Sequence, residues 1–295
     1  MKLIYIMGYG RSGSTLLDII LGDNKHIVTT GALDNYHIWV NKNLKCACDK
    51  KIRECEYWGL VYKDTKFSDD DIKLVREMDS FRSFFTVKRK KFHQNVKKYY
   101  RLNNTLLKSI RTHFRKNVIV DSSKTTLDCI YRPIMFLKYC NFDLKPIFLI
   151  RNPRGVVWSA MKKHGSPERD KKDTMFFRFL RTLISWNLTN LLTILITKVF
   201  LKEFLFIKYE DFCKNPINEL LRIKKFTKSE IDNVANKITK QYPIDIGHNI
   251  GGNRLRFAKS IDSIQLDESW KENMPKFYFY IVTIISYPLI KYFKY

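Results

Sequence analysis

The sequence is poor in acidic residues and has no long apolar run without charge. It holds 29 Asp and Glu against 54 Lys and Arg, for a formal net charge of +25. This excess predicts an anionic partner, such as a nucleotide, an acidic carbohydrate, a nucleic acid or lipid head groups. The longest apolar stretches, 188–201 and 277–290, are broken by charge or fall short of the roughly 20 residues of a membrane span. Neither predicts a transmembrane helix.

Repeats, low-complexity tracts and long linkers are also missing, so we expect a single domain over residues 1–295. The chain enters its first strand without a signal-peptide pattern, which favours a reducing, cytoplasmic location for its six cysteines. Glycine and proline are absent from 69–114, where apolar residues recur at helical spacing. We interpret about 60–115 as a helical insertion within the domain.

Three cysteines lie close together in a lysine-rich loop, at Cys46, Cys48 and Cys55. A structural zinc ion normally has four ligands, and His37 or Asp49 would have to be the fourth. Buried free thiols in a loop are the simpler interpretation, so we expect no metal.

A glycine-rich turn follows the first apolar run of the chain. Leu3 to Met7 has no polar interruption, which is typical of a strand buried on both faces of a parallel sheet. Three glycines (Gly8, Gly10 and Gly13) can take positive φ, and Ser14 and Thr15 could cap a helix that ends at Gly22. The pattern predicts a strand, a glycine loop and a helix.

Such a loop directs backbone amides and a helix N-terminus at one point, which favours binding of phosphate or sulfate. The spacing Gly8-x4-Gly13 fits the start of the P-loop pattern, but Ser14 stands where that pattern has lysine. Arg11, inside the loop, can supply the missing cation. The simpler alternative is an ordinary glycine-rich turn between a strand and a helix.

Further buried strands are predicted at 27–33, 117–120, 146–150 and 204–207, with long helices at 174–200 and 216–226. Two of these strands lead into polar residues: the strand at 117–120 into Asp121-Ser122-Ser123-Lys124, and the strand at 146–150 into Arg151. Parallel α/β sheets place their sites at these ends. We therefore predict a P-loop-like three-layer α/β sandwich with a mostly parallel central sheet.

The chain as a whole resembles the sulfotransferase family that uses 3′-phosphoadenosine 5′-phosphosulfate (PAPS), especially its microbial and carbohydrate-directed members. Four motifs match in order, GYGRSGST, VDSSKT, RNPRGVVWS and IKYEDF, followed by GGNRLRF and a late tryptophan helix near Trp270. The cysteine loop with Trp58 is also similar to one in microbial members. The Arg-x7-Ser spacing from Arg151 to Ser159 is the most specific match.

The resemblance implies roles for individual residues. The loop residues Gly10, Arg11, Ser12, Gly13, Ser14 and Thr15 would bind the 5′-phosphosulfate. Arg151 and Ser159 would bind the 3′-phosphate, Tyr209 would lie by the adenine and Arg256 would close over the 3′-phosphate. Lys124 would contact the oxygen of PAPS that bridges the sulfuryl group and the 5′-phosphate. Many relatives have Gly-Glu after the second strand, but here the sequence is Gly31-Ala32, and Asp34, with His37 behind it, is the substitute base that we predict.

The resemblance thus implies sulfuryl transfer from PAPS to a hydroxyl acceptor such as a carbohydrate, a glycolipid or a small hydroxyl compound. The donor product would be 3′-phosphoadenosine 5′-phosphate (PAP), and no nucleic acid partner is implied. No metal is needed, because Arg11 and Lys124 supply positive charge to the transferring group. A P-loop kinase is the enzymatic alternative, kept open by Asp121. A non-catalytic basic protein that binds anionic surfaces is the other.

The apolar tail at about 276–295 has lysines at both ends. A final helix packed on the core is the simpler interpretation. The alternative is an interfacial helix that rests on anionic lipid, which would make the protein a peripheral membrane protein of the cytoplasm.

Overall fold

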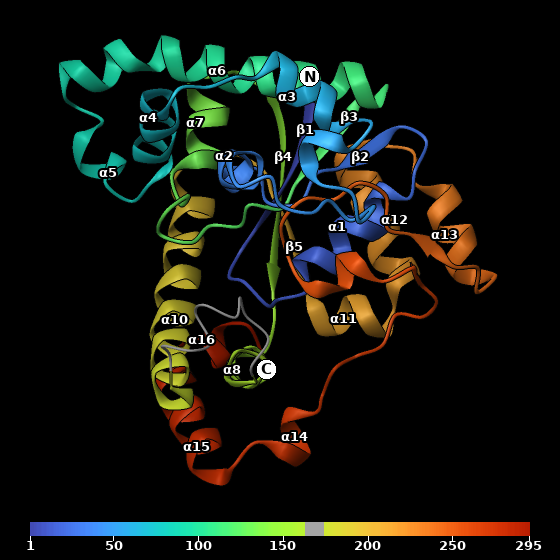
Figure 1. Ribbon diagram of the computed structural model, residues 1–295. Coiled ribbons are helices and arrows are strands. Elements are labelled where there is room, and N and C mark those ends of the chain that lie inside the picture. Colours follow the sequence, from blue (N-terminus) through green and yellow to red (C-terminus); the bar gives the residue numbers. More distant parts are fainter. Residues whose placement is uncertain (163–173) are drawn as a thin grey trace.

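A five-stranded parallel sheet forms the centre of the computed structural model, which describes residues 1–162 and 174–295 (Figure 1). The strand order is β2-β3-β1-β4-β5, and every neighbouring pair is parallel. The strands are β1 Lys2–Met7, β2 Ile27–Thr29, β3 Val118–Asp121, β4 Asp143–Ile150 and β5 Leu205–Lys208. All five predicted strands are confirmed, the second being shorter than predicted.

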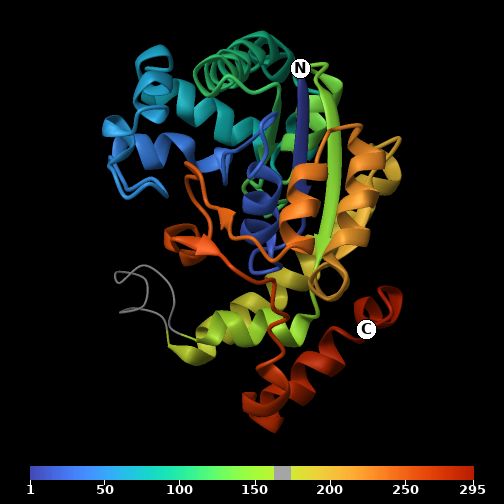
Figure 2. The ribbon, with the colours of Figure 1, turned by 90° about the vertical axis from the view of Figure 1, so that its right-hand side faces the viewer.

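Helices cover both faces of the sheet, as Figure 2 shows. One face carries α3 Trp58–Asp64, α4 Asp69–Asp79, α5 Ser83–Thr86, α6 Lys90–Phe114 and α7 Arg132–Lys138. The other carries α1 Ser14–Gly22, α11 Tyr209–Lys214, α12 Pro216–Thr227 and α13 Asp232–Thr239. Near the carboxyl ends of the strands lie α8 Pro153–Met161, α10 Met175–Val199, α14 Trp270–Asn273, α15 Lys276–Ile285 and α16 Tyr287–Tyr292. Smaller elements are α2 Tyr36–Asn41 and the hairpin of β6 Ile244–Asp245 with β7 Ser260–Ile261.

The central strand β1 is buried on both sides. Leu3, Tyr5 and Met7 pack in the cluster that includes side chains of α6 and α7, whereas Ile4 and Ile6 pack with α1, α12 and α13. All five are at most 1% exposed. Successive strand residues point to opposite faces, so an uninterrupted apolar run requires a layer of helices on each side. The predicted three-layer fold is confirmed.

Two features of the helices were not predicted. Residues 122–131 form an irregular segment after β3, and α7 begins only at Arg132. The tail is two helices, because α15 ends at Ile285 and Pro288 lies in the first turn of α16. Proline has no amide hydrogen to continue the preceding helix, which explains the break.

The long helix predicted at 174–200 is α10, Met175–Val199. Within the described residues, it is the one helix long and apolar enough to cross a membrane by length and composition alone. However, 44% of its most apolar window is buried inside the structure, where it packs against α8. Helices α3 to α6 occupy the segment predicted as an insertion, and the assignment of 1–295 to one domain stays a prediction.

Candidate active site

The turn between β1 and α1 requires glycine at two positions. Gly8 has φ 111°, and a Cβ there would lie 2.2 Å from the carbonyl oxygen of Leu149. Gly13 has φ 88°, and its Cβ would lie 2.4 Å from the ring of Tyr209. Any side chain would displace β4 or α11 from the loop. The glycines therefore let the loop lie directly against the ends of neighbouring elements.

Gly13 is also the residue that precedes the first turn of α1, and it caps the helix without a side chain. The prediction that Ser14 and Thr15 cap the helix is therefore wrong: both are helical and buried. Ser12 is 1% exposed, and its hydroxyl has no partner among the described residues. An unpartnered buried hydroxyl beside a helix N-terminus is suited to an anionic ligand.

Arg11 joins the glycine loop to α8. Its backbone is left-handed, with φ 63°, and its Nη1 donates to the carbonyl oxygen of Ser159 at 3.0 Å and to the Ser159 hydroxyl at 3.4 Å. Arg151, at the end of β4, donates from Nη1 to the carbonyl oxygen of Arg11 at 3.3 Å. The structure thus brings together three residues that the sequence assigned to the donor site.

Arg151 is 6% exposed and lies over the ring of Tyr209, 4.4 Å from its centroid. Its Nη2 donates to the carbonyl oxygen of Asp267 at 2.7 Å and to Oδ2 at 3.0 Å. The Tyr209 hydroxyl donates to the carbonyl oxygen of Gln265 at 3.4 Å, and burial raises its pKa to about 12. The phenol is therefore neutral at ordinary pH. Its ring offers a flat face that can support both the guanidinium and a planar base.

Lys124 follows β3 and is anchored to the glycine loop. Its amide donates to the carbonyl oxygen of Ile6 at 3.1 Å, and the Thr125 amide donates to that of Gly8 at 3.1 Å. The Gly8 amide in turn donates to the Thr125 hydroxyl at 2.9 Å. Because β3 pairs with β1, the end of one strand is fixed beside the loop that follows the other, as predicted.

Asp34 lies next to Lys124. Its amide donates to the Ser123 hydroxyl at 2.9 Å, and Asn35 donates to its Oδ2 at 2.6 Å. Burial raises the pKa of Asp34 to about 6, although the Lys124 ammonium opposes this rise. Its Oδ1 has no partner among the described residues. Asp34 is half-buried, and a carboxylate with one shielded, unsatisfied oxygen is suited to accept a proton near neutral pH.

Asp121, the residue that kept the kinase alternative open, is engaged in buried contacts. Its Oδ2 accepts from Arg132 Nε at 3.3 Å, and its Oδ1 accepts from the Ser123 amide at 2.9 Å. Arg132 also donates to Asp79 at 2.7 Å, and the three charged residues are at most 2% exposed. Asp121 is thus a buried ion-pair partner that fixes the segment carrying Lys124, rather than a catalytic group or a magnesium ligand.

Arg256 lies in the C-terminal loop, which packs on the start of α1. The Asn253 amide donates to the Thr15 hydroxyl at 3.0 Å. Arg256 is 4% exposed, donates to the carbonyl oxygen of Lys45 at 3.1 Å and lies over Trp39. Burial lowers its pKa to about 10, and within residues 1–162 and 174–295 no carboxylate pairs with it. A buried guanidinium without a counter-ion is suited to an anionic ligand.

Asp18 was not among the residues predicted from the sequence. It is fully buried on α1 and accepts from the Gly31 amide at 3.0 Å, Asn249 Nδ2 at 2.7 Å and the Ser122 hydroxyl at 3.3 Å. Burial raises its pKa to about 7. The one signal was an acidic residue inside the apolar helix LLDIIL. Asp18 binds together the segments after β2 and β3 and the C-terminal loop.

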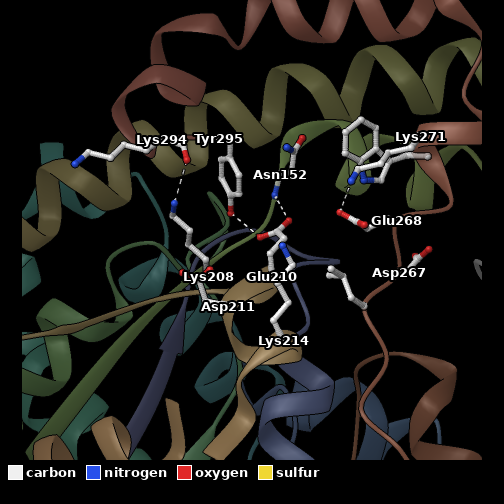
Figure 3. Close-up of a pocket in the computed structure, with 12 residues that line it drawn as sticks. Asn152, Lys208, Glu210, Asp211, Lys214, Asp267, Glu268, Lys271, Lys294 and Tyr295 are labelled. Atoms are coloured by element: carbon white, nitrogen blue, oxygen red, sulfur yellow. Dashed lines mark hydrogen bonds and ion pairs between the residues drawn. The ribbon is translucent and has the colours of Figure 1, made fainter. Parts of the chain in front are cut away.

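Neither of the two best-formed cavities among the described residues includes the glycine loop. The larger, about 270 Å³, borders Arg151 through Asp267 and is lined by polar residues of α11, α14 and the C-terminus (Figure 3). In it, Glu210 accepts from the Asn152 amide and the Tyr295 hydroxyl, each at 2.9 Å. The Arg11 and Arg151 side chains meet instead at the glycine loop, outside both cavities.

The smaller cavity, about 30 Å³, lies by the predicted base. Asp34, His37 and Arg132 line it with apolar side chains from the helical layer, namely Leu33, Phe67, Ile72, Val75, Leu102 and Leu106. Burial lowers the pKa of His37 to about 4, so its imidazole is neutral at ordinary pH. Apart from Asp34 and Arg132, the lining of this cavity is therefore uncharged and mostly apolar, although the chain as a whole is strongly basic.

A glycine loop that opens a helix is suited to bind a phosphate or sulfate group, and in this chain the buried Arg151 contacts that loop. The chain belongs to the sulfotransferase domain family, which matches residues 2–245. It is accordingly a transferase, and this membership favours sulfuryl transfer over the kinase and the non-catalytic alternatives. No curated protein shows significant similarity.

Solved structures agree with this fold. The sulfotransferase domain of the Synechococcus PCC 7002 olefin synthase aligns with a TM-score of 0.55 and 18% identity, over 100% of this chain and 95% of that one. The sulfotransferase domain from the curacin biosynthetic pathway gives 0.52 and 17%, over 98% and 97%. A sulfotransferase of Mycobacterium avium gives 0.50 and 8%, over 98% and 76%. At these identities the likeness concerns the fold alone.

Proposed function

We propose that the protein transfers the sulfuryl group of PAPS to a hydroxyl of a carbohydrate that is linked to lipid. One observation carries this proposal: Lys124 is held by hydrogen bonds beside the glycine loop, and the amide of the half-buried Asp34 donates to the hydroxyl of Ser123, the residue before Lys124. An ammonium for the leaving phosphate and a base for the acceptor are thus adjacent.

In this proposal the 5′-phosphosulfate lies over Gly10 to Thr15, where loop amides, the Ser12 hydroxyl and the N-terminus of α1 meet. The 3′-phosphate binds Arg151 and Ser159, which Arg11 already connects. The adenine lies near Tyr209. Arg256 is the further buried cation available to the nucleotide.

The chemistry is an in-line displacement. The acceptor oxygen bonds to sulfur while the bond from sulfur to the bridging phosphate oxygen breaks, and PAP leaves with the electron pair of that bond. The acceptor proton passes to Asp34. Charge that grows on the bridging oxygen is stabilised by Lys124, and charge on the sulfuryl oxygens by Arg11 and loop amides.

Two features support an acceptor with an apolar part. The cavity beside Asp34 is lined mostly by apolar side chains. In addition, α10 exposes a continuous apolar stripe at helical spacing, consisting of Phe177, Leu180, Ile184, Leu188, Leu191, Leu195 and Val199. Neighbouring α15 exposes Phe277, Tyr280, Ile284 and Ile285.

These two helices are in contact, since the rings of Phe179 and Tyr278 lie 4.6 Å apart and Asn187 donates to the Ser286 hydroxyl at 2.9 Å. Single exposed apolar residues are ordinary, but a stripe along a 25-residue helix is not. With a net charge of +25, the surface formed by α10 and α15 is suited to rest on an anionic bilayer from the cytoplasmic side.

The test is incubation of the purified protein with radiolabelled PAPS and separated cell fractions of lipids, glycolipids and free glycans. We expect label in the glycolipid fraction, lost in a Lys124→Ala control. Label in free glycans alone would refute the lipid-linked acceptor while leaving the donor intact. No label transfer to any fraction, with PAPS bound, would contradict the proposed reaction.

A further inference from the structure

The cysteine loop and the C-terminal loop meet in a cluster that the sequence did not assemble. Cys46, Cys48 and Cys55 come from the segment between α2 and α3, and His248 comes from the loop after β6. The four ligand atoms all lie within 4.8 Å of one another. His37 and Asp49, the fourth ligands considered from sequence, are not members. His248 is 193 residues from Cys55 along the chain, which is why spacing did not reveal it.

The distances fit a tetrahedral ion. Cys46 Sγ and Cys55 Sγ are 3.9 Å apart, and His248 Nδ1 lies 3.3 Å from Cys55 Sγ and 4.0 Å from Cys46 Sγ. A tetrahedral zinc ion with ordinary bond lengths would separate two sulfurs by about 3.8 Å and a sulfur from a nitrogen by about 3.5 Å. A small contraction around one centre therefore satisfies all the ligands.

The surroundings resemble those of a structural metal site. The Trp58 indole donates to the carbonyl oxygen of His248, and the Tyr57 ring lies 4.6 Å from the imidazole. These partners fix the orientation of the histidine.

We propose that Cys46, Cys48, Cys55 and His248 bind one structural zinc ion that fastens the C-terminal loop to the cysteine loop. Three thiolates, a neutral imidazole and Zn²⁺ carry a net charge of −1, and the three thiols release their protons on binding. Soft sulfur ligands with one imidazole in closed tetrahedral geometry favour zinc over magnesium or calcium. The site has no open position for substrate, so its role is structural.

The ion lies where it supports the donor site. From His248 the chain continues to Asn249, which binds Asp18, and to Asn253, which binds Thr15 on α1. Arg256 donates to the carbonyl oxygen of Lys45, the residue before Cys46. A negative metal site near this buried guanidinium partly offsets the cost of its burial. Loss of zinc should therefore loosen the loop that carries Arg256.

The experiment measures metal in the whole chain, purified under reducing conditions and dialysed against metal-free buffer, by inductively coupled plasma mass spectrometry. We expect one zinc per chain in the wild type. We expect the zinc content to fall by about tenfold or more in Cys55→Ser and in His248→Ala. Cys140→Ser, a buried thiol outside the cluster, and His93→Ala are the controls and should keep full occupancy.

Cobalt gives a second measurement that does not depend on how the variants fold. Co²⁺ added to metal-free wild type should produce the thiolate charge-transfer and visible bands of a tetrahedral site, and zinc should abolish them. Hydrogen exchange of amides 247–256 should quicken on metal removal, whether or not PAPS is turned over. A wild type that takes up neither ion, or that forms a Cys46 to Cys55 disulfide in reducing buffer, would overturn the proposal.

Discussion

Asp267 accepts two hydrogen bonds from Nη2 of Arg151, one at its backbone carbonyl oxygen, 2.7 Å away, and one at its carboxylate Oδ2, 3.0 Å away. If Arg151 binds the 3′-phosphate as proposed, that phosphate has to compete with the Asp267 carboxylate, which is about half exposed. Without nucleotide, Asp267 keeps the buried cation paired.

Removal of the cation should weaken nucleotide binding. Charge-assisted hydrogen bonds contribute about 1.5 to 3 kcal/mol, so we expect Arg151→Ala to weaken PAP binding roughly 10-fold to 100-fold in calorimetry. Arg222→Ala, a surface arginine paired with Glu219, is the control. Adenosine 5′-phosphosulfate should bind wild type poorly, and equal affinity for both nucleotides would contradict the assignment.

Removal of the competing carboxylate should have the opposite effect. The pair is partly solvated, which limits its strength to about 1 kcal/mol or less. We therefore expect Asp267→Asn to bind PAP about two to five times more tightly, with a smaller gain at high salt. An unchanged affinity would mean that the nucleotide does not displace Asp267.

Lys124 should act on the chemical step. Its ammonium would stabilise charge that develops on the bridging oxygen, so Lys124→Ala should slow single-turnover transfer by roughly 100-fold or more with PAP affinity almost unchanged. Lys116→Ala, which changes a lysine that donates to carbonyl oxygens near β2, controls for loss of one positive charge. A Lys124→Ala enzyme with a normal rate would refute this role.

Asp34 should set the acidic limb of the rate profile. Its pKa is raised to about 6 by burial, and a base must be ionised, so the single-turnover rate should fall as pH drops through this value. At one pH unit below that pKa the rate should be about a tenth of the plateau. Asp34→Asn should be slow at every pH without this limb. A fast Asp34→Asn enzyme would place the base elsewhere.

Asp18 should make the protein less stable as pH rises. Its folded-state pKa of about 7 exceeds the ordinary value of 3.8, so the folded state binds the proton more tightly than the unfolded state. Stability from this group is complete below about pH 4, and the free energy of unfolding declines by about 1.4 kcal/mol for each pH unit up to about pH 7. Asp18→Asn keeps an acceptor for Gly31 and should flatten the change. Urea midpoints between about pH 4 and 8, compared with Asp143→Asn, test this.

The apolar stripe of α10 should carry lipid binding. In flotation with anionic vesicles, wild type should rise with lipid and an Ile184→Glu, Leu191→Glu double variant should stay at the bottom. Phe85→Glu, on α5, changes an aromatic residue that is 71% exposed and should float like wild type. Wild type that stays at the bottom with anionic vesicles would refute the membrane contact.

Local patterns predicted much of the fold. The strands contain short apolar runs, mostly buried in β1 to β4 and partly buried in β5, and such runs depend little on distant sequence. Polar residues at the strand ends converge because parallel strands share one edge, which brings Arg11, Lys124 and Arg151 to the same side of the sheet.

Contacts between distant segments could not be predicted in this way. Asp18 and Asn249 are 231 residues apart, and His248 joins the cysteines across a similar span. Asp121 lies at the end of a buried strand, where sites gather, but its partner Arg132 begins α7, eleven residues further along the chain. Periodicity reports which face a residue occupies, and it does not report which buried charge neutralises another.

The pairing of Gly31 with Ile250 has a consequence for engineering. A Cβ on Gly31 would lie 1.7 Å from the carbonyl oxygen of Ile250, and the Ala32 amide donates to that same oxygen at 3.2 Å. Any graft of acceptor-binding segments from another sulfotransferase has to begin after Ala32. A junction drawn at the end of β2 would replace the two residues that hold the C-terminal loop in place, and a chimera intended to change the acceptor would lose its donor instead.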